Sequence, residues 1–190
     1  MTVLLSTGKA YCEATAVQSC RTIVQPTVAI EKISSLETGE INPASGNASD
    51  LSSSFNLQSN DNETFFVIYS TLITKDGSTM SAFDTNGNLL FANKEYPPTI
   101  SAVNNAKQGT KGNRNVIGYK LSLTGGNFDI SYTESSIYND CYKLSLKESL
   151  TSGTLVQAVG GTPIANTYGV GEDMSGSYTV TVYITGTSKI

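Results

Sequence analysis

The strongest constraint on the fold is an alternating segment close to the C-terminal end of the sequence. Residues 176–185 read Gly-Ser-Tyr-Thr-Val-Thr-Val-Tyr-Ile-Thr. Successive side chains of a β-strand point to opposite faces of a sheet, so the core-facing positions are predicted to be Tyr178, Val180, Val182 and Ile184. A strand with one buried face needs a sheet around it and a second layer to pack against, which predicts a β-sheet protein.

Most of the remaining sequence consists of short apolar runs separated by turn residues. The most apolar run, 64–73, predicts a central strand, and Asn86-Gly87 between two apolar runs predicts a hairpin turn. The core is expected to begin at residues 20–24. Residues 99–106 allow one or two helical turns at most. Short strands punctuated by Gly, Asn and Pro predict an all-β fold, a mostly antiparallel β-sandwich.

The length of 190 residues fits one large β domain, and such a chain can bury a sizeable core. Hydrophobic residues make up 38% and charged residues 15%, and the Ser, Thr, Asn and Gly that replace them suit outer strand faces and turns. We therefore expect a single β-sandwich domain over residues 20–190, preceded by an N-terminal extension over residues 1–19.

The charge and residue content exclude several function classes. The formal net charge of −4 argues against nucleic acid as a partner, because phosphate binding needs a basic face. The sequence contains no histidine, which removes Ser-His-Asp and Cys-His catalysis and the commonest transition-metal ligand. The segment from Asp84 to Asn88 has its glycine at the wrong position for a calcium loop. We expect no enzyme activity, no cofactor and no metal site, and no apolar run is long enough for a membrane span.

Three cysteines leave one over if a disulfide forms. A Cys20–Cys141 bond would tie the first strand region to a late strand, whereas a Cys12–Cys20 bond would close a short local loop. Geometry decides between the two pairings, so Cys20 and Cys141 stand as the disulfide candidate with the alternative left open.

The closing segment resembles the last strand of subunits of bacterial chaperone–usher pili (fimbriae). Those subunits are incomplete immunoglobulin-like sandwiches that end in an alternating strand preceded by a glycine about fourteen residues from the terminus, and Gly176 stands at that place here. The sequence departs from the family pattern in having Lys189 where a tyrosine is usual. The family's early disulfide also has no counterpart, because no cysteine lies between residues 21 and 140.

The resemblance implies an immunoglobulin-like sandwich that assembles by β-strand addition into an extracellular fibre on the cell surface. Its partners would be other copies or related subunits, with a periplasmic chaperone as a further candidate. Residues 2–17 would be the strand donated to a neighbour, and the candidate assembly residues on one face of it are Val3, Leu5, Thr7 and Tyr11. The alternative for this segment is a tail or an ordinary first strand.

Two other functions fit an all-β chain of this composition. One is a structural protein of a virus or phage. The other is a carbohydrate-binding adhesin module, which a shallow aromatic patch would favour; the candidate rings are those of Tyr69, Tyr96, Tyr119 and Tyr138.

Overall fold

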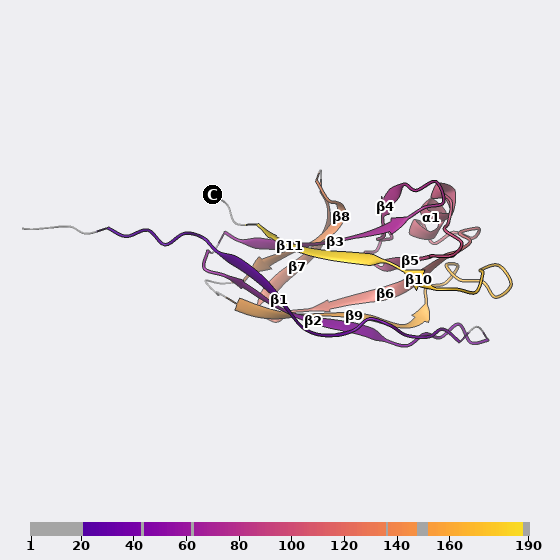
Figure 1. The fold of residues 1–190 in the computed structure, drawn as a ribbon, viewed down its shortest axis with the longest axis horizontal. Helices are drawn as coiled ribbons and strands as arrows, with labels where there is room; N and C mark the ends of the chain where they lie inside the picture. Colours follow the sequence, from indigo (N-terminus) through magenta and orange to yellow (C-terminus); the bar gives the residue numbers. More distant parts are fainter. Residues whose placement is uncertain (1–20, 43, 62, 136, 148–151, 188–190) are drawn as a thin grey trace, which may run out of the picture.

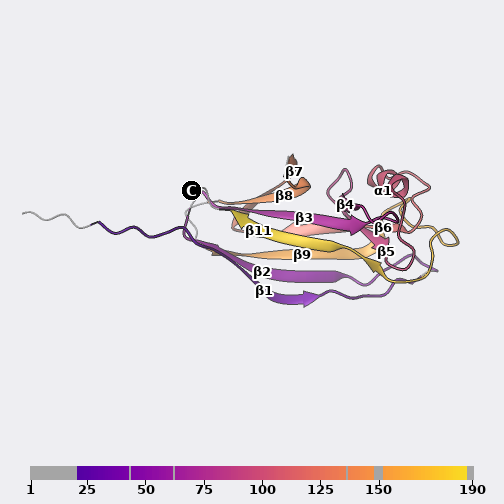
Figure 2. The ribbon, with the colours of Figure 1, turned by 45° about the horizontal axis from the view of Figure 1, so that its top comes forward.

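Two antiparallel sheets stack face to face in the computed structural model (Figures 1 and 2). The structure describes residues 21–42, 44–61, 63–135, 137–147 and 152–187. Within them, every strand pair is antiparallel. The all-β sandwich predicted from the sequence is confirmed.

The first sheet has six strands in the order β1-β2-β9-β6-β5-β10. Their bounds are Val28–Leu36 (β1), Leu51–Ser59 (β2), Ser152–Pro163 (β9), Val116–Thr124 (β6), Leu89–Asn93 (β5) and Tyr178–Thr179 (β10).

The second sheet has the order β11-β3-β8-β7, with the short β4 paired to the end of β3. Its strands are Thr181–Thr187 (β11), Phe65–Ile73 (β3), Asn139–Leu146 (β8), Phe128–Ser135 (β7) and Thr79–Ser81 (β4). The apolar run at residues 64–73 forms β3, which lies between β11 and β8 as a central strand.

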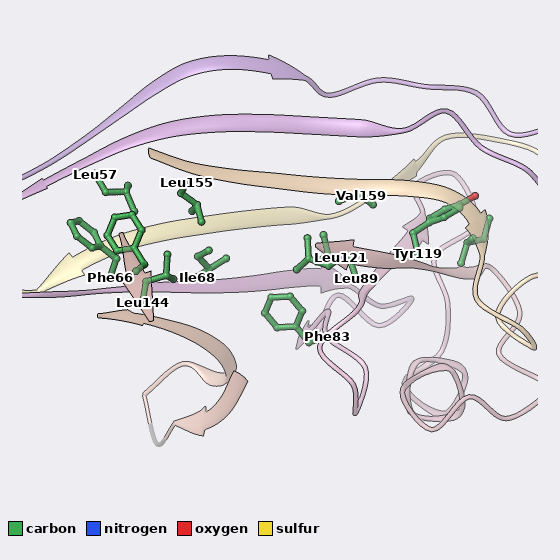
Figure 3. Close-up of a cluster of buried hydrophobic side chains, with 12 residues drawn as sticks. Leu57, Phe66, Ile68, Phe83, Leu89, Tyr119, Leu121, Leu144, Leu155 and Val159 are labelled. Atoms are coloured by element: carbon green, nitrogen blue, oxygen red, sulfur yellow. The ribbon is translucent and has the colours of Figure 1, made fainter. Parts of the chain in front are cut away.

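The main core fills the space between the two sheets (Figure 3). Strand alternation supplies it: β3 buries Phe66 and Ile68 completely on its inner face, and Leu144 meets them from β8. The first sheet contributes Leu57 and Leu155 from neighbouring strands, both fully buried. This layer of aliphatic and aromatic side chains gives the largest favourable contribution to folding, because burial of apolar surface dominates the stability of such domains.

A second, smaller core lies under the single described helix, α1 (Ile100–Lys107). Thr99 caps the helix by accepting a hydrogen bond from the backbone N–H of Ala102 (3.2 Å). Val103 is fully buried against side chains of β5 and β6 that alternate with those facing the main core. The helix therefore covers the outer face of one end of the first sheet.

The expectation that the core begins at residues 20–24 is wrong for the part of that segment the structure describes. Ile23 is 65% exposed and Val24 is 78% exposed, and residues 21–27 form no strand. Figure 1 shows this segment extending away from one end of the sandwich. The apolar pattern identified an extended segment, but an extended segment is buried only where the same chain supplies a partner. The proposed extension over residues 1–19 lies outside the described residues.

The Asn86-Gly87 turn forms where the sequence predicted it, and a second glycine turn lies at Gly77. Gly77 and Gly87 have φ angles of 83° and 79°, a left-handed conformation that glycine adopts without steric cost. Asp84 accepts hydrogen bonds from the backbone N–H groups of Asn86 and Asn88, both at 2.8 Å. The Asp84 carboxylate therefore stabilises the turn in which it lies. Among the described residues no cluster of acidic, cysteine or histidine side chains could hold a metal ion.

Two isoleucines of β3 provide a matched test of the layered core. Ile68 is fully buried, whereas Ile73 at the end of the same strand is 62% exposed. We expect Ile68→Ala to lower the free energy of unfolding by about 2–5 kcal/mol, because it removes apolar contacts and leaves a cavity. Ile73→Ala should change it by about 0.5 kcal/mol or less. Urea unfolding followed by circular dichroism measures both, and equal losses would contradict the assignment of the core.

Candidate assembly groove

The closing segment of the chain passes from one sheet to the other. Tyr178 and Thr179 pair with β5 in the first sheet, whereas β11 pairs with β3 in the second. Val180 lies between the two strands and packs against both cores. The segment predicted as one strand is therefore two strands joined at a bend, a device by which a chain closes one corner of a sandwich.

The four side chains predicted to face the core all pack against it. Tyr178, Val180, Val182 and Ile184 are partly buried, and the threonines between them are exposed at positions 179 and 181. Gly176 precedes them with a φ of 146°, where an added Cβ would lie 2.6 Å from a carboxylate oxygen of Glu95. Only glycine fits that backbone without a collision.

β1 is an open edge of the first sheet. Among the described strands it pairs with β2 alone, and every residue after Val28 is exposed. Its apolar side chains are 39% exposed at Ile30, 57% at Ile33 and 54% at Leu36. An edge strand carries a row of unpaired backbone N–H and C=O groups, so β1 offers both the backbone and the side chains for pairing with another strand.

β11 is an open edge of the second sheet, since β3 is its one partner among the described strands. β1 and β11 meet at one end, where the side chains of Val28 and Phe66 both lie against Gly186. Toward the other end the two strands separate (Figure 2). Toward that end the residues that follow β1 (37–41) and those that precede β11 (173–179) line a common cavity, and we call this cavity, together with the strand edges beside it, the assembly groove.

The separated end of the assembly groove deepens into a cavity of about 680 Å³. Its floor is the inner face of the first sheet, and its walls are residues 37–41 and residues 168–179. The side chains that face the cavity from successive strands are Leu51, Phe91, Ile117, Tyr119, Val159 and Tyr178. At this end the inner face of the first sheet is thus open, whereas at the other end the second sheet covers it.

Tyr119 is the most unusual residue of the cavity. It is 5% exposed, and its hydroxyl is buried with no hydrogen-bond partner among the described residues. Burial raises the pKa of Tyr119 to about 12, and the neighbouring Tyr168 and Tyr178 add to the effect. In Figure 3 its hydroxyl oxygen points away from Leu89 and Leu121. A buried hydroxyl without a partner costs free energy, and a partner that entered the cavity would remove that cost.

The charged side chains that line the cavity are all acidic: Glu37, Glu40 and Asp173. Glu37 accepts a hydrogen bond from Lys32 at 2.6 Å, and this bond lowers the pKa of Glu37. Burial raises the pKa of Asp173, although the backbone N–H groups of Gly169 and Asn115 donate to its carboxylate. We call these three residues the acidic end of the groove.

A second surface lies on the outer face of the second sheet. Tyr69 stacks on Tyr183 with ring centroids 4.8 Å apart and on Tyr138 at 5.0 Å, which forms a tyrosine ladder across three segments. Tyr183 stands on one side of β3 and Tyr138 on the other, so both faces of the Tyr69 ring are occupied by its neighbours. A sugar platform needs free ring faces, and in this ladder the Tyr69 ring is covered by its neighbours whereas Tyr183 is 42% exposed. Tyr96 is exposed and Tyr119 lies in the groove, so the four rings considered from the sequence do not form one patch.

The remaining predicted site residues divide between described and undescribed parts of the chain. Cys141 lies in β8 with 2% of its surface exposed, and burial raises the pKa of its thiol. No disulfide occurs among the described residues, and Cys12 and Cys20 lie outside them. The candidate assembly residues Val3, Leu5, Thr7 and Tyr11 also lie outside the described residues. Sequence reasoning missed the groove itself, because β1, β6 and residues 168–179 meet only in the folded chain.

Comparisons with known proteins give no family for this chain. No protein-family model matches it, and no curated protein matches it. Among solved structures it is similar to the DNA-binding domain of Cep-1, the C. elegans ortholog of human p53, with 6% sequence identity and a TM-score of 0.33 over 85% of this chain and 81% of that chain. A similarity this low supports no inference about function. No helix in the described part of the chain is long and apolar enough to cross a membrane.

Two tyrosines of the cavity test its polar lining. Tyr119→Phe removes a hydroxyl that has no partner among the described residues, so the free energy of unfolding should stay the same or rise by about 1 kcal/mol. Tyr178→Phe removes a hydroxyl that donates to the carbonyl of Met174 at 2.7 Å, so the free energy of unfolding of this variant should fall by about 1 kcal/mol. Chemical unfolding curves of each variant and of the wild type measure these changes in the free energy of unfolding. A loss of more than about 1 kcal/mol in Tyr119→Phe would mean that its hydroxyl has a partner in solution.

Proposed function

We propose that this protein is a structural subunit that assembles into an extracellular fibre by β-strand addition. The observation that carries the proposal is the assembly groove: a cavity with an apolar floor, walled by the residues that follow the edge strand β1 and by those that precede the edge strand β11. An extended segment placed there would form backbone hydrogen bonds with an edge and bury apolar side chains on the floor. The resemblance of residues 176–185 to the last strand of chaperone–usher pilus subunits supports the same function.

The two ends of the molecule are suited to a head-to-tail chain. Residues 21–27 extend from one end of the sandwich, whereas the loop before β10, which lines the cavity, lies at the other end (Figure 1). A segment that leaves one subunit at the first end can enter the next subunit at the second. Repetition of this contact along the long axis builds an open linear assembly, as heterologous interfaces that do not close into a ring do.

The donated segment in this proposal is the N-terminal extension of a neighbouring copy, over residues 2–17. Val3 and Leu5 would be its apolar anchors, and burial of each contributes about 1.5–3 kcal/mol at most. Before assembly, the open edge and the exposed apolar side chains of β1 need another protein to cover them. A periplasmic chaperone is the partner that the pilus resemblance implies for this step.

The two alternative functions predict different contacts. A virus or phage structural protein would bury the open edges in a closed shell. A carbohydrate-binding adhesin would bind sugars on exposed aromatic rings, which the tyrosine ladder does not favour. The groove between two unpaired edges favours the fibre subunit over both.

Deletion of residues 1–17 is expected to abolish self-association and leave the melting temperature of the domain unchanged, because the deleted strand serves the neighbour and not its own domain. Multi-angle light scattering and negative-stain electron microscopy measure the assembly, and calorimetry measures the melting temperature.

A synthetic peptide of residues 2–17 serves as the matched control. It should bind the truncated protein and raise its melting temperature, since a ligand that binds only the folded state stabilises it. The same peptide with Leu5→Glu should do so less, because it would place a charge on the apolar floor. If the truncated protein still assembles, or if its melting temperature falls, the extension is not a donated strand.

A further inference from the structure

The acidic end of the groove carries no basic lining residue. Glu37 is paired with Lys32, but the carboxylate of Glu40 forms no ion pair among the described residues, and Asp173 is half-buried. Because Lys32 offsets the charge of Glu37, it is Glu40 and Asp173 that give the aromatic-lined cavity a negative potential at the place where an inserted strand would end. A neutral or acidic side chain would gain nothing there, whereas a cation would gain Coulomb attraction and contact with the tyrosine rings.

The N-terminal extension contains one basic side chain, Lys9, in residues 2–17. Strand alternation puts Lys9 on the same face as Val3, Leu5 and Tyr11, the face expected to turn toward the groove floor. Lysine suits a half-open cavity, because its aliphatic stem packs on apolar surface while its ammonium stays near solvent and the rim.

The direction of the inserted strand decides which end of it meets the acidic end. The second sheet is antiparallel throughout its described strands, so a strand added beside β11 continues the pattern by running antiparallel to it. Its first residues then lie near Gly186, and its later residues lie near Tyr178. Residues 178–187 span about 33 Å at roughly 3.3 Å per residue, which a segment such as 2–11 matches in length.

We propose that the acidic end of the groove selects the inserted strand by binding Lys9 of a second copy of this chain. The inference rests on the proposed function and adds to it the side chain that the groove recognises. Glu40 and Asp173 line this end of the cavity, and the hydroxyl of Tyr119, which has no partner among the described residues, lines the same cavity as a further acceptor. The apolar anchors supply affinity, and the ion pair supplies the choice of partner and of register.

A charge exchange in the full-length protein tests this selection. Lys9→Glu places two like charges in contact at the acidic end, and Glu40→Lys does the same with the opposite sign. Each variant alone should weaken self-association on the order of tenfold, since a favourable pair is replaced by a repulsive one.

Mixing the two variants should restore assembly, because the strand of each variant carries the charge opposite to that in the groove of the other variant. The strand of the Lys9→Glu variant carries a new carboxylate, which fits the new ammonium in the groove of the Glu40→Lys variant. The strand of the Glu40→Lys variant still carries Lys9, which fits the unchanged Glu40 in the groove of the Lys9→Glu variant. Light scattering of the mixture, compared with each variant at the same total concentration, measures the recovery.

Two controls separate recognition from folding and from net charge. Glu63→Lys makes the same change in net charge at an exposed turn outside the groove and should assemble as the wild type does. Lys9→Gln should assemble with a weaker dependence on salt than the wild type, because screening acts on the ion pair that it lacks. Circular dichroism of Glu40→Lys checks its fold, and Glu40→Gln replaces it if that fold is lost.

The outcomes distinguish the two proposals. If Lys9→Glu assembles as well as the wild type while deletion of residues 1–17 abolishes assembly, Lys9 is not recognised and the fibre subunit stands. If the mixture of the two charge variants stays as weak as each alone, the predicted pair of Lys9 and Glu40 is overturned. If the deletion leaves assembly intact, both proposals fail together.

Discussion

The bend at Val180 is the contact on which the shape of this molecule depends. By packing against both cores, this one side chain joins the strand that ends the first sheet to the strand that begins the edge of the second. The bend closes the sandwich at β5 and β10 and commits β11 to lie across the opposite layer. At the opposite edge of the first sheet, β2 is the one described strand that pairs with β1. The chain itself therefore links the β10 edge of the first sheet to the second sheet, whereas the β1 edge is unpaired among the described strands.

An open side is costly for a β protein, because unpaired edges invite non-specific pairing. Two features of β1 limit this risk. Its register shifts between Lys32 and Ser34, which interrupts the regular ladder, and Lys32 puts a charge on the edge. The exposed isoleucines remain nevertheless, and the cavity keeps an apolar floor with an unsatisfied hydroxyl. A protein that gains stability only when its groove is filled links its folding free energy to its partners.

Local patterns predicted much of the fold and little of the site. The apolar run located β3, period-2 alternation located the closing segment, and the Asn86-Gly87 pair located the turn at Gly87, because each signal lies within a few residues of sequence. The same signal could not show that the closing segment divides at Val180, since a gentle bend leaves the alternation intact. It also misplaced Ile23 and Val24 in the core, because burial depends on a neighbouring strand and not on the strand's own pattern. The groove needed segments far apart in the sequence, β1 and residues 168–179 among them, to be brought together.

The contact between Val28 and Gly186 closes the groove at one end. In the proposed assembly, a segment that enters from the open end would advance only until its first residues reach that contact, so the closed end would fix the position of the inserted strand. This matters because a slip of a single residue turns every side chain of a strand to the opposite face. Glycine at position 186 lets the two strands approach closely enough to form the stop. In the proposed assembly, Gly186 would therefore set the alignment of the inserted strand.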